Sequence, residues 1–225
     1  ADPRHMRVSV AQLLDPGRLK TLGAGIDPKG RAAGATVVSS ADAPNTVYII
    51  AADERGNVVS MIQSLFASFG SGIVVPGAGV VLHNRASLFS LDAGHPNALA
   101  PGKLPYHTLC PLLALKGGKP WLAFGTPGGD GQTHTDLQIL NNVLLFGMAP
   151  QQAIDVPRRR RMASGERRLE DRIPEEGRLA LEARGYRASR RPSSADFGGA
   201  QAVLIDGGGL RAGADRRREA WATAY

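Results

Sequence analysis

Apolar and polar positions change their spacing several times along the chain, and each change predicts an element. Apolar residues favour β-structure over 46–53 and 58–66, and the turn between these two runs contains Gly56, which indicates a hairpin. The same pattern returns over 109–115 and 121–125 and predicts a second hairpin. Shorter strands are expected over 80–83, 200–205 and 210–212.

Helical spacing is clearest over 133–146, where apolar residues recur every three or four positions. This spacing predicts one buried helix face, made of Leu137, Ile139, Leu140, Val143 and Leu144. Further helices are expected over 150–156, 174–184 and in short pieces over 8–14 and 19–22. Strand pairs, then helices, then strands again predict an α+β layered sandwich rather than an alternating βαβ fold.

Composition supports a folded protein, because 43% of the 225 residues are hydrophobic and 21% are charged. The net charge of +7 comes mainly from arginines in the last third, without the interleaved aromatic residues of a single-strand nucleic-acid surface. We therefore expect a solvated face or a subunit contact, and no nucleic-acid partner. These arginines are Arg158, Arg159, Arg160, Arg161, Arg167, Arg168, Arg190, Arg191, Arg216, Arg217 and Arg218.

Several classes of chemistry have no signature in this sequence. Cys110 is the single cysteine, so an internal disulfide and a zinc site of paired thiolates are excluded. The five histidines lack metal-ligand spacing, and no phosphate-loop or dinucleotide motif is present. We expect neither a metal nor a cofactor, and no membrane span. The chain opens without Met, and we expect an N-terminal portion to be missing, which leaves its localisation open.

Several short motifs resemble the gamma-glutamyltransferase family in sequence, order and spacing. They cover about residues 40–225. The motifs are Asn45-Thr46-Val47-Tyr48, Asp53-Glu54-Arg55-Gly56-Asn57-Val58-Val59-Ser60, Phe69-Gly70-Ser71-Gly72-Ile73-Val74, Pro101-Gly102-Lys103, Gly125-Thr126-Pro127-Gly128-Gly129, Pro157-Arg158, Glu170-Asp171-Arg172-Ile173-Pro174 and Gly213-Ala214-Asp215-Arg216-Arg217.

The resemblance implies an N-terminal-nucleophile hydrolase with an αββα sandwich, made as a precursor that cuts itself between Asn45 and Thr46. Residues 1–45 would then be the end of a large-subunit segment with its linker, and residues 46–225 the catalytic small subunit. The freed amine of Thr46 can serve as the base for its own hydroxyl. The partners implied are a small amide or gamma-glutamyl substrate and the large-subunit portion. Assembly into a higher oligomer stays open.

Carried over residue by residue, the resemblance implies that the amides of Gly128 and Gly129 form the oxyanion hole and that Ser64 bonds to the nucleophile. The positions that bind the substrate's charged groups in the family hold Phe66, Leu88 and the pair His107-Thr108 in this chain. Two polar partners have thus become apolar, which removes paired charges from the expected specificity pocket.

The departure at these positions favours a gamma-glutamyltransferase-like acylase whose acyl group is less polar than glutamate. Two alternatives remain. The first is an authentic gamma-glutamyltransferase and glutathione hydrolase whose recognition groups come from elsewhere. The second is an inactive fragment or structural subunit.

Overall fold

A four-stranded antiparallel sheet forms the centre of the computed structural model, which describes residues 2–30, 46–193, 196–207 and 209–224. Its strand order is β11-β10-β6-β5. The strands are β5 (Leu112–Lys116), β6 (Lys119–Gly125), β10 (Gln201–Asp206) and β11 (Gly209–Ala214). The predicted strands over 109–115, 121–125, 200–205 and 210–212 are therefore confirmed, with shifted ends.

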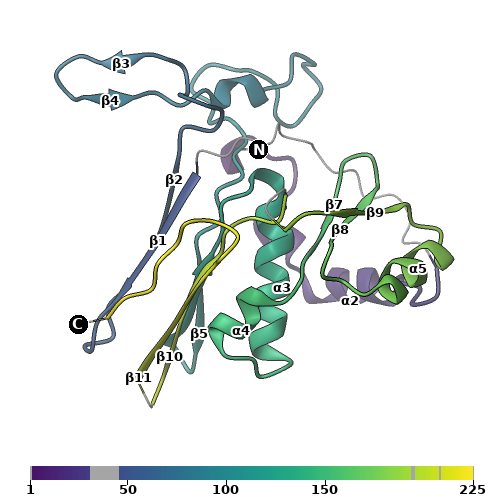
Figure 1. Ribbon diagram of the computed structural model, residues 1–225. Coiled ribbons are helices and arrows are strands. Elements are labelled where there is room, and N and C mark those ends of the chain that lie inside the picture. Colours follow the sequence, from purple (N-terminus) through teal and green to yellow (C-terminus); the bar gives the residue numbers. More distant parts are fainter. Residues whose placement is uncertain (1, 31–45, 194–195, 208, 225) are drawn as a thin grey trace.

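The hairpin of β1 (Thr46–Ala52) and β2 (Val58–Ser64) packs on one face of this sheet, as Figure 1 shows. Its register pairs Thr46 with Ser64 and Tyr48 with Ile62. The sequence predicted a second strand that continues to residue 66, but the strand ends at Ser64. Phe66 adopts a φ of 76°, a left-handed conformation that a strand does not accommodate.

Two helices, α3 (Gln132–Leu144) and α4 (Pro150–Asp155), cover the opposite face of the sheet (Figure 1). Both were predicted, but the buried face of α3 was predicted only in part. Leu137 and Leu144 are exposed. The face toward the sheet combines Ile139 and Val143 with the polar residues Gln132, Thr135 and Asp136. The core between helices and sheet contains Leu122, Phe124, Ile139, Val143, Ala153, Ile154, Ala200, Ala202 and Leu204.

A smaller three-stranded sheet lies beyond α3 and contains many of the arginines (Figure 1). Its elements are β7 (Arg159–Arg161), β8 (Arg167–Glu170), β9 (Ala188–Arg191) and the adjacent α5 (Glu175–Ala183). The expectation of a solvated arginine face is wrong in part. Arg158 and Arg160 are buried, and the Arg217 side chain is only 4% exposed. Carboxylates and carbonyl oxygens inside the fold bind Arg158 and Arg217.

The remaining elements are short. They are η1 (Pro3–His5), α1 (Val10–Leu13), α2 (Pro16–Ala24), β3 (Val74–Val75), β4 (Val80–Val81), η2 (Arg85–Leu88) and η3 (Gly129–Gly131). The two short helices expected within 8–22 are present as α1 and α2. Within the described ranges, every helix is too short or too polar to cross a bilayer.

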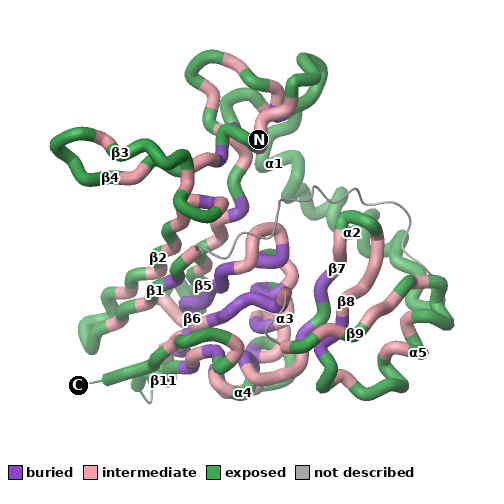
Figure 2. Tube along the Cα trace, turned by 45° about the horizontal axis from the view of Figure 1, so that its top comes forward, coloured by how far each residue is buried: buried purple, intermediate pink, exposed green. Residues whose placement is uncertain are grey.

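The α+β class is confirmed, and the layers follow the order hairpin, sheet, helices. These are three of the four layers of the expected αββα sandwich. On the outer side of the hairpin, Val47, Ile49, Val59 and Met61 are between 43% and 52% exposed. Figure 2 shows the contrast between this exposed hairpin and the buried strand β6.

Candidate active site

Thr46 is the first residue of β1 and lies beside the end of β2. Its Oγ1 donates a hydrogen bond to Ser64 Oγ at 3.0 Å. Ser64 Oγ also accepts the backbone N–H of Phe66 at 2.9 Å. One serine hydroxyl therefore positions the Thr46 hydroxyl and also supports the left-handed turn at Phe66. Left-handed conformations of bulky residues are uncommon and concentrate at functional sites.

The glycine pair predicted to form the oxyanion hole follows β6. Gly128 has a φ of 139° and Gly129 a φ of 56°, conformations that favour glycine. The carbonyl oxygen of Gly128 accepts the N–H of Gly131 at 3.0 Å at the start of the short helix η3. Across the described chain, neither the Gly128 N–H nor the Gly129 N–H has a hydrogen-bond acceptor. Two unoccupied amides are what an oxyanion needs.

The end of β6 lies against the start of β1. A Cβ added to Gly125 would lie 2.8 Å from the ring of Tyr48, so glycine is required for this close approach. The Tyr48 hydroxyl is 2.6 Å from Ser60 Oγ across the hairpin, and burial raises the pKa of Tyr48 to about 12. Tyr48 thus stays a neutral spacer between the strand that carries Thr46 and the strand that leads to Gly128.

A second loop supports the glycine pair from behind. Thr126 Oγ1 donates to Pro127 O at 2.7 Å and accepts the N–H of Gly199 at 3.0 Å. A Cβ on Gly198, whose φ is 77°, would lie 2.3 Å from Thr126 Oγ1. The loop around Gly198 therefore holds the Thr126–Gly128 backbone in place.

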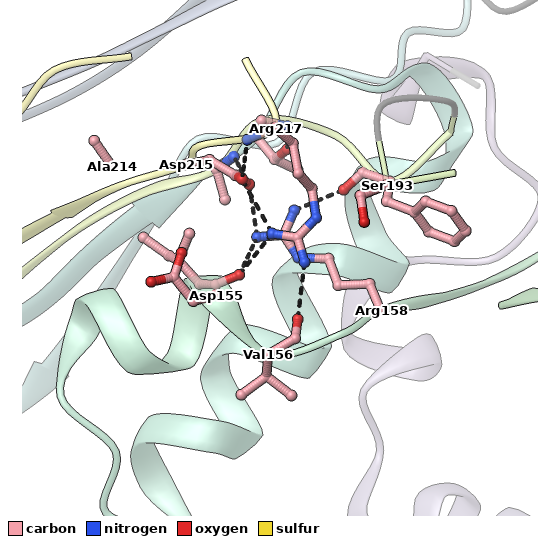
Figure 3. Close-up of polar contacts among 12 residues, drawn as sticks. Asp155, Val156, Arg158, Ser193, Ala214, Asp215 and Arg217 are labelled. Carbon is pink, nitrogen blue, oxygen red and sulfur yellow. Dashed lines mark hydrogen bonds and ion pairs between the residues drawn. The ribbon is translucent and has the colours of Figure 1, made fainter. Parts of the chain in front are cut away.

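This supporting loop is tied to a cluster of buried charges, which we call the balanced cluster: Arg158, Glu170, Asp215 and Arg217. Arg158 Nη2 lies 2.7 Å from Asp215 Oδ2, and Arg217 Nη1 lies 3.0 Å from Asp215 Oδ1. Arg217 also pairs with Glu170. Figure 3 shows Arg158, Asp215 and Arg217 pointing toward one another. Two positive and two negative side chains are thus neutralised inside the fold.

The balanced cluster also bonds the supporting loop directly. Asp215 Oδ2 accepts the N–H of Ala200 at 2.8 Å, and Arg158 Nη1 donates to Phe197 O at 2.6 Å. These bonds fix the residues on both sides of Gly198. The sequence motifs contained Arg158, Asp215 and Arg217, but sequence reasoning missed their role in support of the glycine pair.

The predicted substrate-binding pair His107-Thr108 also lies in this region. Thr108 is buried, and its Oγ1 accepts a hydrogen bond from Arg85 Nη1 at 3.4 Å. His107 is exposed, and its pKa is lowered, first by partial desolvation and then by the positive charge of Arg85. The preceding residue, Tyr106, donates its hydroxyl to Asp130 Oδ1 at 3.2 Å and so connects this pair to the loop that carries Gly128 and Gly129.

Arg85 is the functional candidate that sequence reasoning missed. It opens η2, and Leu88, another predicted substrate-binding residue, closes the same helix and is partly buried. The Arg85 guanidinium lies over the ring of Phe66, with 4.9 Å between Cζ and the ring centroid. The sequence carried no clear signal for its burial, because Arg85 follows the polar residues His83 and Asn84.

The structure brings together Thr46, Ser64, Phe66 and Thr108 directly or through Arg85. Asn45, the residue before the predicted cut, lies outside the described residues. Within the part of the chain that the structure describes, no group of three His, Cys, Asp or Glu residues could hold a metal ion.

Comparison with known proteins places this site in a family. The family model described as gamma-glutamyltranspeptidase matches residues 1–225. The chain belongs to the gamma-glutamyltranspeptidase family.

Individual members of the gamma-glutamyltranspeptidase family carry different names. The chain is 42% identical over 157 residues to a glutathione hydrolase-like YwrD proenzyme of Bacillus subtilis, covering 70% of this chain and 29% of the relative. It is 42% identical over 158 residues to an oxamate amidohydrolase proenzyme of Klebsiella pneumoniae, which again covers 70% of this chain and 29% of the relative. The chain thus spans less than a third of each relative's length.

The solved structure of the cephalosporin acylase from Bacillus halodurans is similar over the whole chain. The chain superposes with a TM-score of 0.87 at 35% identity, over 100% of this chain and 41% of the acylase. The fold described above is therefore shared with this cephalosporin acylase.

Proposed function

We propose that this chain is the catalytic part of an amide-cleaving acylase that cuts itself before Thr46 and then uses Thr46 as its nucleophile. The observation that carries the proposal is the position of the Thr46 hydroxyl. It is bonded to Ser64 at 3.0 Å at the start of β1, and Tyr48 of the same strand packs against Gly125, which precedes a loop whose two glycine amides have no acceptor in the described chain. The word proenzyme in the names of both curated relatives supports self-cleavage.

Self-cleavage follows from the chemistry of one residue. Thr46 Oγ attacks the carbonyl carbon of Asn45, the peptide C–N bond breaks, and the hydroxyl proton passes to the departing nitrogen. Water then hydrolyses the resulting ester, which leaves a carboxylate on Asn45 and a free amine on Thr46. Residues 46–225 become the small subunit, and residues 1–45 stay with the remainder of the precursor as the second partner.

Turnover repeats the same attack on a substrate. The Thr46 amine takes the hydroxyl proton, Oγ adds to the substrate amide carbonyl, and the Gly128 and Gly129 amides bind the oxyanion. The leaving amine accepts that proton as the C–N bond breaks. Water then cleaves the acyl ester and releases a carboxylic acid. No separate base is required, since the amine and the hydroxyl belong to one residue.

An acyl group without an ammonium fits this site better than a gamma-glutamyl group. Phe66 is 6% exposed and apolar, and Leu88 supplies no carboxylate to pair with an ammonium. The acylase and amidohydrolase names among the relatives support the same preference. An authentic gamma-glutamyltransferase is the second candidate, favoured by the family itself.

The test uses the complete precursor with three p-nitroanilides, which carry glutaryl, valeryl and gamma-glutamyl groups. We expect one of the first two to be cleaved with a higher kcat/KM than the gamma-glutamyl compound. Thr46→Ala should lower every rate by at least about 10⁴-fold. Thr21→Ala, which alters an exposed hydroxyl on α2, serves as the matched control and should change nothing.

Preference for the gamma-glutamyl compound would favour the second candidate. No hydrolysis of any anilide, with no effect of Thr46→Ala, would indicate an inactive structural subunit and overturn the proposal.

A further inference from the structure

The N-terminal segment over 2–7 is bonded to the loop over 90–106, which is distant from it in the sequence. Charged side chains of the segment bind backbone groups of the loop. Hydrogen bonds run from Leu104 N–H to Asp2 Oδ2 at 2.9 Å, from Arg4 Nη2 to Gly102 O at 3.1 Å and from Arg7 Nη2 to Gly94 O at 3.2 Å. The segment thus holds the loop at two places, near its start and near its end.

Asp2 is the buried centre of this contact, since its side chain is only 1% exposed. Its Oδ1 accepts the backbone N–H of Arg4 at 3.0 Å and Arg4 Nε at 3.1 Å, and its Oδ2 lies 2.7 Å from Arg4 Nη2. The hydrogen bonds from Arg4, and then the one from Leu104, lower the pKa of Asp2 well below its ordinary range. Leu104 is therefore held by an ionised carboxylate, which makes the stronger kind of hydrogen bond.

Asn97 joins the two ends of the 90–106 loop. It is buried, its Nδ2 donates to Leu88 O at 2.7 Å, and its Oδ1 accepts the N–H of Tyr106 at 3.2 Å. Leu88 and His107, the neighbour of Tyr106, are positions that the family resemblance places in substrate binding. A shift of the loop is thus passed to two predicted substrate-binding residues.

The point that Asp2 holds is connected to Asn97 within the loop. Lys103, the residue before Leu104, donates its Nζ to Pro96 O at 2.8 Å, directly beside Asn97. The bond from Asp2 therefore acts on the part of the loop that positions both ends.

The 2–7 segment and the 90–106 loop lie on opposite sides of the proposed cut between Asn45 and Thr46. Before the cut they belong to one chain. Once the chain is cut, the hydrogen bonds from Asp2, Arg4 and Arg7 connect two separate subunits.

We propose that Asp2 is a positioning residue: the 2–7 segment stays bound after the cut and holds the 90–106 loop, and with it Leu88 and His107, in place for substrate binding. This inference rests on the proposed function, because the cut and the substrate site belong to it. Asp2 acts through Leu104 and Asn97 rather than by contact with the substrate.

The test replaces Asp2 by Asn in the complete precursor. Both oxygens of Asp2 accept N–H groups, so an Asn amide turns a donor toward a donor in either orientation. Asp15→Asn is the matched control, because Asp15 accepts the N–H of Arg18 at the start of its own helix at 2.8 Å. Arg4→Met, which removes the bond to Gly102 O and keeps Asp2, is the second variant if Asp2→Asn fails to assemble.

The first readout is the kinetics of the anilide that the wild type cleaves best. Asp2→Asn should raise KM at least about fivefold and leave kcat within about twofold, because Thr46 and its contacts are unchanged. A merely structural role would lower the amount of active enzyme, and so kcat, at constant KM. Arg4→Met should raise KM less, and Asp15→Asn should change neither constant.

The second readout is cleavage of the Lys103–Leu104 bond by a lysine-specific protease. A protease cuts a folded loop only where it opens, so the rate follows the open fraction. The N–H that Asp2 binds belongs to this very bond. Asp2→Asn should raise the rate at least about 10-fold, as expected for loss of a charge-assisted hydrogen bond, and Asp15→Asn should not alter it.

The two readouts separate this inference from the proposed function. If the wild type cleaves no anilide, yet Asp2→Asn still accelerates the cut after Lys103, the proposed function fails and the hold of Asp2 on the loop stands.

If Thr46-dependent cleavage occurs but Asp2→Asn and Arg4→Met keep the KM and the protease rate of the wild type, the role of Asp2 is overturned. It is also overturned if only kcat falls. Native mass spectrometry of the active, processed enzyme should find the fragment that ends at Asn45 bound to the small subunit, and its absence would equally contradict the proposal.

Discussion

The molecule handles buried charge in two different ways. In the balanced cluster, Arg158 and Arg217 meet Asp215 and Glu170 behind the loop of Gly128 and Gly129, and each charge has a partner. Near Thr46, Arg85 is equally buried and has no acidic partner among the described residues. Burial of a charge costs free energy unless it is paired. Paired charges therefore hold the scaffold in this protein, whereas the buried charge near Thr46 stays uncompensated within the described residues.

Asp136 is a second buried ionisable residue without a partner among the described residues. It is buried on α3, and both of its carboxylate oxygens have no hydrogen-bond partner in the described part of the chain. Burial, opposed in part by the charge of Arg158, raises the pKa of Asp136 to about 8. A carboxyl group can become neutral in this way, whereas the guanidinium of Arg85 keeps its charge.

The largest effect is expected when the balanced cluster loses one partner. Asp215→Asn should lower the free energy of unfolding by about 3–5 kcal/mol, because Arg158 then lacks a buried counter-ion and Arg217 keeps only Glu170. Asp206→Asn, which breaks the exposed pair with Arg211, should cost less than about 1 kcal/mol. Urea unfolding of both variants measures the difference. Equal losses would show that the balanced cluster does not hold the scaffold.

Replacement of Gly198 tests whether its loop supports the backbone of Gly128 and Gly129. In Gly198→Ala the new methyl group would clash with Thr126 Oγ1 at 2.3 Å and strain a φ of 77°. We expect kcat to fall about 100-fold, the magnitude seen when one oxyanion donor is lost. Gly207→Ala is the control, since a Cβ there meets nothing within 4 Å. An unchanged kcat in a folded Gly198→Ala protein would show that this loop does not contribute to catalysis.

A pH dependence of stability should come from Asp136. Between its usual pKa of 3.8 and the raised value of about 8, the folded chain holds a proton that the unfolded chain has released. The contribution of Asp136 to stability is therefore greatest below about pH 4 and falls as the pH rises toward 8, by at most about 1.4 kcal/mol per pH unit. Asp136→Asn should remove this slope.

Unfolding at pH 5 and pH 8 measures the effect of Asp136→Asn, with Asp206→Asn as an exposed control. If the Asp136→Asn protein and the wild type differ by the same amount at both pH values, the carboxyl group is ionised in the fold.

The smallest effect is expected for the stability of Arg85→Met. Loss of the contact with Phe66 costs free energy, but removal of an uncompensated buried charge returns a similar amount. The free energy of unfolding should therefore change by less than about 1 kcal/mol. A loss as large as that of Asp215→Asn would show that Arg85 stabilises the fold as strongly as the balanced cluster does.

The elements could be predicted from the sequence wherever local pattern decides them. The hairpin of β1 and β2 and the helix α3 follow from apolar spacing, yet spacing alone assigned Leu137 and Leu144 to the buried face of α3. The true face includes polar Gln132 and Asp136, and a hydrophobic pattern cannot reveal them.

The β7–β9 sheet escaped prediction for a different reason. Its strands are rich in arginine, and partners such as Arg217 and Glu170 are far apart in sequence. The burial of Arg85 was missed because charged residues are normally exposed. Its neighbours Phe66 and Thr108 were identified through the family resemblance, but only the fold shows that they share this guanidinium.

The proposed catalysis depends on Thr46 becoming an N-terminal nucleophile. N-terminal sequencing of the smaller fragment from the purified, complete precursor tests this step, with Thr46→Ala as the control that should stay uncut. We predict a fragment that begins Thr46-Val47-Tyr48-Ile49. A precursor that remains whole while it hydrolyses an anilide, or a cut at another bond, would contradict the proposal.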